Sequence, residues 1–298
     1  MQARLGPVAS DSRQALEKGR HGRASDSGSA DRAGRPAPSW HVLCKRVPPL
    51  RHDARGATDF SLDLNGMSAS EENASRSSLI HYSVLPRHML EEHLQPRGID
   101  DPRVLKAMLC VPREEFVPDE LRGAAYDDAP CPFGSGRSVA SPATVARMAQ
   151  ALSLEGHERV LEVGTGSGYG AAILSQLARR VYTVECVPDL AAEAAARLES
   201  LRCRNVEVRC GDGSRGLAAE APFDGIAVTA GTPAVPLAYF EQLADGGRLV
   251  IPVGDAARQA LYLFQRDGNR LTLEMLGEVA FVPLIGASGW ESAVDALP

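Results

Sequence analysis

The stretch that decides the fold is Val160-Leu161-Glu162-Val163-Gly164-Thr165-Gly166-Ser167-Gly168-Tyr169-Gly170, which continues as Ala171-Ala172-Ile173-Leu174. An apolar run that ends in alternating glycines and then turns into a helix-forming segment predicts a buried strand, a tight turn and a helix. Glycine has no Cβ, so it tolerates positive φ and lets backbone N–H groups approach a ligand. The stretch therefore predicts a site for an adenosine-bearing cofactor.

The glycine spacing fits two kinds of cofactor site. Gly164, Gly166 and Gly168 form G-x-G-x-G after the acidic Glu162, whereas Gly166, Gly168 and Ala171 fit the looser dinucleotide pattern G-x-G-x-x-G/A. A nicotinamide dehydrogenase would also need an acid–base His or a Tyr-x-x-x-Lys near the strand edge, and neither is evident in the sequence. An ordinary tight turn between a strand and a helix is the structural alternative.

Acidic residues follow the ends of the next two expected strands. The strand Val181–Val184 leads into Glu185, 19 residues after Gly166, near the roughly 20 residues at which an acid accepts hydrogen bonds from a ribose. The strand 205–210 leads into Gly211-Asp212-Gly213, where the carboxylate can reach an adenine amino group. The alternatives are a chance surface Glu and an ordinary Asp-Gly turn.

Two further strands are expected at 223–230 and 243–254, and helical stretches separate the strands, notably 189–201. Strand–helix alternation predicts an α/β fold with a mostly parallel, doubly wound sheet and helices on both faces. In such a sheet the ligand lies at the carboxyl edge of the strands.

Charge is divided unevenly along the 298 residues, whose net charge is −6. Residues 1–66 have a net charge of +4 and residues 67–298 a net charge of −10. An acidic catalytic part argues against a nucleic-acid substrate, because phosphate binding draws on Lys and Arg. The six cysteines form no C-x-x-C pair, and no His cluster accompanies them, so we expect reduced thiols in a cytoplasmic protein and no metal site. No apolar run approaches the roughly 18 residues of a membrane span.

The beginning of the chain has a different composition from the rest. Residues 10–39 are mainly Ser, Arg, Ala, Asp, Gly and Pro, which bury too little apolar surface to offset the entropy of ordering. We therefore expect a disordered or poorly ordered extension over 1–78, either a solvated linker or a basic interaction tail, and a catalytic domain over 79–298. Within that domain, Asp101-Pro102 predicts an N-capped helix in a small N-terminal helical subdomain.

Several motifs together resemble one family. They are Met89–Ile99 (MLEEHLQPRGI), Val111–Pro118 (VPREEFVP), Ala125–Asp128 (AYDD), the glycine-rich stretch, VYTVE, GDG, PFDGIAVTA, GGRLVIPVG and Phe281–Gly286 (FVPLIG). In this order they resemble the protein-L-isoaspartate O-methyltransferases, a group of class I S-adenosylmethionine-dependent methyltransferases. The resemblance covers residues 80 to 290.

The resemblance implies a Rossmann-like class I methyltransferase fold and S-adenosylmethionine as cofactor. It places Glu185 on the ribose, Asp212 near the adenine, and Gly164 to Gly168 at the methionine end. The full set of residues expected to bind the cofactor is Glu162, Gly164, Thr165, Gly166, Ser167, Gly168, Glu185, Asp212, Gly213 and Thr229.

One position departs from the resembled family. Its P-I-G-x-G-x-T-I-S-x-P segment aligns without a gap to Pro132–Pro142, which places Ala140 where the family has its active-site serine. Ser138 replaces the family threonine, and Ser141 is the next residue after Ala140. By analogy Ser138 and Ser141 are the candidate catalytic residues that would hydrogen-bond the substrate carboxyl. The structural alternative is a loop and helix-start sequence.

The implied activity is methyl transfer to the free carboxylate of L-isoaspartyl residues in damaged proteins, which starts their repair through a succinimide. A carboxylate is already ionised at pH 7, so no general base is required, and no Ser/His/Asp triad is evident. The alternative is a weakened or retargeted cofactor-binding relative with another acceptor or a regulatory role. The expected partners are damaged proteins and peptides. Neither a nucleic acid nor a membrane is expected, and the chain is expected to be a monomer.

Overall fold

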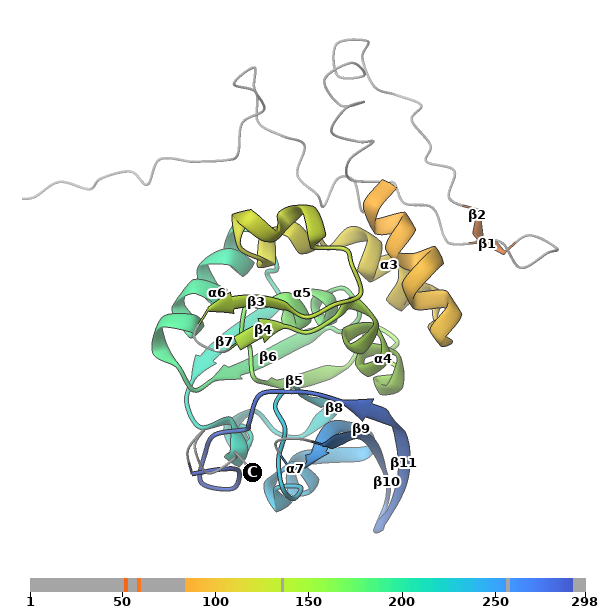
Figure 1. Cartoon of the computed structure of the whole chain (residues 1–298). Coiled ribbons are helices and arrows are strands. Elements are labelled where there is room, and N and C mark those ends of the chain that lie inside the picture. Colours follow the sequence, from red (N-terminus) through yellow and green to blue (C-terminus); the bar gives the residue numbers. More distant parts are fainter. Residues whose placement is uncertain (1–50, 53–57, 60–83, 135–136, 256–257, 292–298) are drawn as a thin grey trace, which may run out of the picture. The chain divides into compact units, whose positions relative to one another are not determined.

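A seven-stranded sheet organises the chain in the computed structural model, which describes residues 51–52, 58–59, 84–134, 137–255 and 258–291. In spatial order the strands are β11, β10, β9, β8, β5, β6 and β7 (Figure 1). Their bounds are β5 (Arg159–Val163), β6 (Arg180–Glu185), β7 (Val206–Cys210), β8 (Phe223–Val228), β9 (Leu243–Gly254), β10 (Gln259–Asp267) and β11 (Arg270–Val279). The predicted mostly parallel α/β sheet is confirmed, because β9, β8, β5, β6 and β7 pair in parallel.

The strand order reverses beside β5. The chain runs outward from β5 through β6 to β7, and then returns to place β8 on the other side of β5. In open α/β sheets a crevice forms at the carboxyl ends of the strands where the order reverses. The ends of β5 and β8 therefore mark where a ligand is expected.

Apolar residues of the central strands face two separate cores. Val160 of β5 belongs to a cluster with buried residues of the helices α3, α4 and α5, while Leu161 and Val163 pack on the other face with Tyr239 of α7. Both faces of the parallel strands are thus covered, as their near-continuous apolar sequences require. The helices are α3 (Pro102–Cys110), α4 (Pro142–Leu152), α5 (Tyr169–Ser175), α6 (Pro188–Ser200) and α7 (Leu237–Gln242).

Short elements before the sheet form the expected N-terminal helical subdomain. They are η1 (Met89–Leu94), η2 (Gln95–Arg97), α3, η3 (Arg113–Phe116), η4 (Asp119–Ala124) and the hairpin of β3 (Cys131–Gly134) and β4 (Arg137–Val139). Two further short helices, η5 (Gly213–Arg215) and η6 (Ala218–Glu220), follow β7 and lie outside this subdomain. The predicted cap of α3 is confirmed, since the Asp101 carboxylate accepts a hydrogen bond of 2.8 Å from the Arg103 N–H and Pro102 opens the helix.

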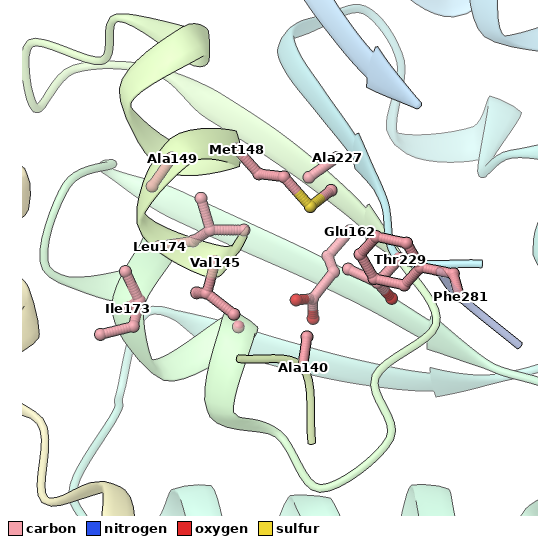
Figure 2. Close-up of a pocket in the computed structure, with 11 residues that line it drawn as sticks. Ala140, Val145, Met148, Ala149, Glu162, Ile173, Leu174, Ala227, Thr229 and Phe281 are labelled. Carbon is pink, nitrogen blue, oxygen red and sulfur yellow. The ribbon is translucent and has the colours of Figure 1, made fainter. Parts of the chain in front are cut away.

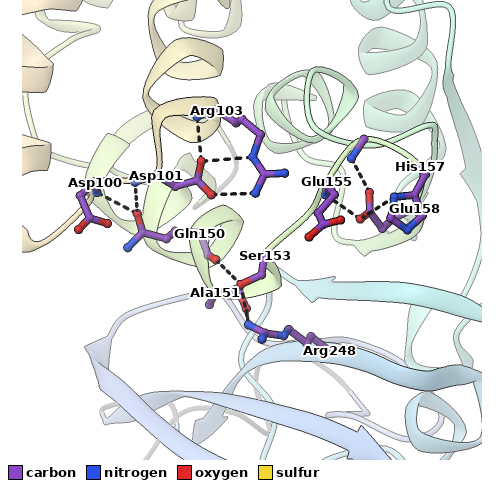
Figure 3. A network of polar contacts seen from close by, with 11 residues as sticks. Asp100, Asp101, Arg103, Gln150, Ala151, Ser153, Glu155, His157, Glu158 and Arg248 are labelled. Carbon is purple, nitrogen blue, oxygen red and sulfur yellow. Dashed lines mark hydrogen bonds and ion pairs between the residues drawn. The ribbon is translucent and has the colours of Figure 1, made fainter. Parts of the chain in front are cut away.

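Polar contacts fasten this subdomain to the sheet through α4 (Figure 3). The Gln150 side-chain oxygen accepts from the N–H groups of Asp100 and Asp101 at 2.9 and 3.0 Å. At the end of the same helix, the Arg248 guanidinium of β9 donates to the Ala151 carbonyl at 3.0 Å and to the Ser153 hydroxyl at 2.6 Å. The position of α4, and of the loop before it, is therefore fixed from both sides.

The antiparallel strands β10 and β11 were not among the expected elements. They add to β9 and to each other across the two-residue turn Gly268–Asn269. The expected extension over 1–78 lies outside the described residues except for the short pair β1 (Arg51–His52) and β2 (Thr58–Asp59), so its disorder stays a prediction. No helix among the described residues is long and apolar enough to cross a membrane.

Candidate active site

The residues expected to bind the cofactor come together at the carboxyl edge of four neighbouring strands. The glycine turn Gly164–Gly168 follows β5, Glu185 ends β6, Asp212 follows β7 and Thr229 follows β8. These four segments are far apart in the sequence, and the parallel pairing of β8, β5, β6 and β7 aligns their ends.

The glycine turn has the backbone that its sequence predicts. Gly164, Gly166 and Gly168 have φ values of 97°, 52° and 90°, which side chains with a Cβ adopt only with strain. A Cβ at Gly164 would also lie 2.5 Å from the Thr229 hydroxyl oxygen, which itself donates to the Gly164 carbonyl at 2.6 Å. The close approach of β5 and β8 at the crevice therefore requires glycine at 164.

Glu185 lies directly beside this turn. Its buried carboxylate accepts a hydrogen bond of 2.9 Å from the Gly166 N–H and one of 3.1 Å from the Val187 N–H. A carboxylate fixed by two backbone donors keeps further lone pairs for other donors. This arrangement fits a sugar with neighbouring hydroxyl groups, so the structure accommodates the predicted ribose contact.

Asp212 is held by the C-terminal loop as well as by its own turn. One carboxylate oxygen accepts from the Ser214 hydroxyl at 2.6 Å, and the other accepts from the Ala287 N–H at 3.0 Å. Burial acts to raise the pKa of the Asp212 carboxyl, but hydrogen bonds from Ser214 and Ala287 and the nearby Arg215 hold this pKa below its usual range. The carboxylate is thus ionised at neutral pH beside Gly213 and can accept hydrogen bonds. The loop that contains Ala287 is a neighbour that sequence reasoning did not identify.

Glu162 is the most deeply buried acid of the site. Its carboxylate accepts a hydrogen bond of 2.6 Å from the Thr183 hydroxyl, which lies 2.7 Å from the Thr165 hydroxyl. Burial raises the pKa of Glu162 to about 8, and the negative charge of Glu185 acts in the same direction. A bound cation would stabilise the ionised form, so this carboxylate fits the cationic methionine end of the expected cofactor.

A mostly apolar cavity connects Glu162 to the loop before α4 (Figure 2). In Figure 2 the Glu162 carboxylate points toward Ala140, with Thr229 and Phe281 beside it. The lining residues are Ala140, Val145, Met148, Ala149, Glu162, Gly170, Ile173, Leu174, Ala227, Thr229 and Phe281. The cavity therefore brings the segment expected to hold the acceptor next to residues expected to hold the cofactor.

The two candidate serines occupy different surroundings from Ala140. Ser138 is exposed on β4, opposite Pro132 in the hairpin. Ser141 is the N-cap of α4, where its hydroxyl accepts from the Thr144 N–H at 3.4 Å and lies 3.1 Å from the Thr144 hydroxyl. Among the described residues the cavity lining includes Ala140 and neither serine. The catalytic roles of both serines stay predictions, while position 140 is the one that faces the cavity.

The five cysteines within the described ranges, Cys110, Cys131, Cys186, Cys203 and Cys210, are free. The same part of the chain contains no group of three or more His, Cys, Asp or Glu side chains that could hold a metal ion.

Comparison with known proteins identifies the family. The family model for protein-L-isoaspartate(D-aspartate) O-methyltransferase matches residues 86–289. The chain is 50% identical to protein-L-isoaspartate O-methyltransferase 2 of Marinobacter nauticus over 210 residues, 70% of this chain and 96% of that protein. It is 49% identical to protein-L-isoaspartate O-methyltransferase of Syntrophotalea carbinolica over 72% of this chain and 99% of that protein.

A solved structure agrees with these relatives. A Plasmodium falciparum protein, named as a candidate protein-L-isoaspartate O-methyltransferase in complex with S-adenosyl-L-homocysteine, matches with a TM-score of 0.57 and 26% identity, over 69% of this chain and 98% of that chain. The expected Rossmann-like methyltransferase fold is therefore confirmed, and the chain belongs to the protein-L-isoaspartate(D-aspartate) O-methyltransferase family.

Proposed function

We propose that this protein transfers a methyl group from S-adenosylmethionine to the free carboxylate of L-isoaspartyl residues in damaged proteins and peptides. The observation that carries the proposal is a cavity that Ala140, Glu162 and Thr229 line together. It joins the loop that aligns with the family's acceptor-binding segment to Glu162 of β5 and to Thr229 after β8, two of the residues expected to bind the cofactor. Relatives of nearly the same length as residues 86–289 are named for this activity.

This reaction depends on the alignment of the methyl donor and the acceptor carboxylate more than on proton transfer. S-adenosylmethionine supplies a methyl group on a positively charged sulfur. The acceptor carboxylate, ionised at neutral pH, attacks the methyl carbon in line as the carbon–sulfur bond breaks, which leaves a methyl ester and a neutral thioether. The neighbouring amide nitrogen then attacks the ester carbonyl carbon and expels methanol, because methoxide leaves far more readily than the oxide of a free carboxylate. The ring closes to a succinimide, and its hydrolysis returns part of the material as normal aspartate.

The protein's own residues bind, align and desolvate the reactants. Glu185 and Asp212 would hold the ribose and the adenine, and the turn Gly164–Gly168 would lie against the methionine end. Backbone groups around 138–141 and the edge at Thr229 would hold the substrate in an extended conformation. Orienting the two reacting groups and excluding water from them supply the rate enhancement.

The partners and location that we propose follow from charge and chemistry. Residues 67–298 have a net charge of −10, which disfavours a nucleic-acid partner, so the acceptors are proteins and peptides that contain isoaspartyl residues. We further propose that the chain acts in the cytoplasm, which the free cysteines of the described ranges support, and that it acts as a monomer.

A second candidate function follows from Ala140. A methyl group stands where the resembled family has its serine, and this favours a weakened enzyme or one with a different acceptor. Labelled methyl transfer to an isoaspartyl peptide separates the two candidates when the matching aspartyl peptide is the control. The proposal expects label in the isoaspartyl peptide alone; equal label in both peptides, or none in either with S-adenosylmethionine bound, supports the retargeted relative.

A further inference from the structure

A buried arginine next to the site takes no part in the chemistry described so far. Arg113 of η3 is 0% exposed. Its Nε donates to the Ala125 carbonyl at 2.6 Å, its Nη2 donates to the Ala140 carbonyl at 2.7 Å, and its guanidinium carbon lies 4.6 Å from the ring centroid of Tyr169. Its third nitrogen, Nη1, is buried without a hydrogen-bond partner among the described residues.

This arrangement is costly for the fold. A buried cation is usually paired with a carboxylate, and within the described part of the chain no carboxylate lies within ion-pair distance of Arg113. A well-packed apolar side chain in its place would avoid both the desolvated charge and the unsatisfied N–H. The two carbonyl contacts are therefore the feature that sets this arginine apart from an ordinary core residue.

The contacts of Arg113 join the segments on either side of the hairpin β3–β4. Ala125 precedes the hairpin, and Ala140 follows it directly. We call the segment 138–141, which comprises the end of β4 and the two residues before α4, the acceptor loop. A second contact supports the same connection, since the Asp128 carboxylate accepts from the Ala143 N–H at 3.0 Å in the first turn of α4. The acceptor loop is thus held against the N-terminal subdomain from two points.

The contact with Ala140 has a direct geometric consequence. The carbonyl direction of a residue is coupled, through ψ and the planar peptide, to the direction of its Cβ. Holding the Ala140 carbonyl therefore holds the direction in which the side chain at 140 faces. That side chain lines the cavity beside Glu162 and Thr229 (Figure 2).

We propose that Arg113 is a positioning residue, which fixes the acceptor loop so that position 140 and its backbone face the substrate carboxylate. This inference rests on the proposed function. The planar guanidinium donates to two carbonyls at fixed relative angles, and the single ammonium of a lysine cannot reproduce that geometry. Arg113 acts on the acceptor side of the site, so its loss changes catalysis and leaves cofactor binding intact.

The test compares Arg113→Lys and Arg113→Gln with Phe116→Leu. Phe116 packs on the same Tyr169 ring at 5.4 Å and makes no contact with Ala140 in the hydrogen bonds described, so its variant loosens the same core without releasing the loop. Arg113→Lys keeps a buried positive charge and Arg113→Gln removes it. If the buried charge causes a folding defect, that defect affects Arg113→Lys and not Arg113→Gln. Kinetics on an isoaspartyl peptide, cofactor affinity by calorimetry and Tm are measured for all variants.

We expect both Arg113 variants to lose about tenfold to a hundredfold in kcat/KM with S-adenosylmethionine affinity within about twofold of the parent. Phe116→Leu should retain most of the parent's kcat/KM, even if its Tm falls as far as the Tm of the Arg113 variants. A loss in the Arg113 variants no larger than in Phe116→Leu at equal Tm, or an equal loss of cofactor affinity, would overturn the positioning role.

A double-mutant cycle with Ala140→Ser gives a readout that general destabilisation does not move. If Arg113 sets the direction of side chain 140, any change in kcat/KM caused by Ala140→Ser should shrink in the Arg113→Lys background. Equal changes in both backgrounds contradict the proposal.

Hydrogen exchange separates failure of this inference from failure of the proposed function. If the parent methylates no isoaspartyl peptide, the proposed function fails. In Arg113→Lys the backbone amides of residues 137–141 should still exchange faster than in the parent, and those of residues 159–168 should exchange at the parent's rate. Unchanged exchange over 137–141 would remove the positioning role independently of the substrate.

Discussion

At the scale of single residues, the candidate site contains three carboxylates at strand ends, and their surroundings differ. Glu185 is fixed by two backbone N–H groups beside the glycine turn, Asp212 is held by Ser214 and Ala287, and Glu162 is enclosed with Thr183. The first two fit hydrogen bonding to hydroxyl and amino groups, and the third fits a cation. Each therefore gives a different response to substitution.

Glu185→Ala should weaken S-adenosylmethionine binding. The change removes a charged acceptor and leaves the ribose hydroxyls poorly paired, a loss of roughly 1.5–3 kcal/mol, or about tenfold to a hundredfold in Kd. Calorimetry measures it, and Glu199→Ala on the exposed face of α6 is the matched control. Equal affinities of parent and Glu185→Ala, or tight binding of NAD by the parent, would remove the cofactor assignment.

Glu162 should make both stability and cofactor affinity depend on pH. Burial raises its pKa from the ordinary 4.5 to about 8 in the folded protein. The folded state therefore holds a proton that the unfolded state releases, so the contribution of Glu162 to stability is complete below about pH 4.5 and is lost as pH rises through about 8. Binding of the cationic cofactor should ionise Glu162 and release its proton.

Cofactor affinity should accordingly rise as pH increases toward about 8, the pKa of Glu162 in the free protein, and level off above that value. Calorimetry in two buffers of different ionisation enthalpy counts the protons released, and Glu162→Gln removes the part due to this residue. If the parent and Glu162→Gln release the same number of protons at pH 7, Glu162 does not titrate on binding.

At the scale of elements, the acceptor loop is the place where the resemblance aligns Ala140 with the family's active-site serine. Ser141 caps α4 and Ser138 is exposed, so the cavity is faced by the methyl group of Ala140. A hydroxyl at 140 could donate to the substrate carboxylate from the position where the family has it. The contact between Arg113 and the Ala140 carbonyl already fixes the backbone at this position, so Ala140→Ser needs no rearrangement of the loop.

Ala140→Ser should therefore raise activity toward isoaspartyl peptides. One hydrogen bond to a charged group is worth about 1.5–3 kcal/mol, which corresponds to about tenfold to a hundredfold in kcat/KM. Steady-state kinetics measures the gain, and S-adenosylmethionine affinity should not change. A parent that is already as active as Ala140→Ser, and that loses its activity in Ser141→Ala, would show that the neighbouring serine has taken the role.

Elements with a local signal could be predicted from the sequence, and those set by distant contacts could not. The glycine turn, the parallel strands and the Asp101-capped α3 each follow from adjacent residues. The strands β10 and β11 also had a signal, since alternating residues flank the two-residue turn Gly268–Asn269. The contact of Ala287 with Asp212 joins residues 75 apart, and nothing local indicates it.

Arg113 gives the clearest case of this limit. In Val111–Pro118 it stands next to Glu114 and Glu115, which is the pattern of a solvated charged turn. The structure buries it completely against Tyr169 and the carbonyls of Ala125 and Ala140. Its partners Ala125 and Ala140 lie 12 and 27 residues away in the sequence, and Tyr169 lies farther still, so only the fold reveals this environment.

At the scale of the whole molecule, the family match occupies residues 86–289, and the sheet, its helices and every residue of the site lie within that range. Deletion of residues 1–66 should therefore leave Tm and cofactor affinity nearly unchanged, because this segment lacks apolar patterning and precedes all the matched motifs. Thermal melts with and without S-adenosylmethionine measure both. A drop of many degrees on deletion would show that the segment is part of the fold.

We propose that the protein converts isoaspartyl residues through methylation of their free carboxylate. The most direct measurement incubates a pure isoaspartyl peptide with the full-length protein and S-adenosylmethionine, and follows the isoaspartyl and aspartyl forms by chromatography and mass spectrometry. We expect a methyl ester, then a succinimide, and finally a growing share of the normal aspartyl peptide, all dependent on the cofactor. The proposed function is wrong if the isoaspartyl peptide stays unchanged with the cofactor bound, or if the aspartyl peptide is methylated at the same rate.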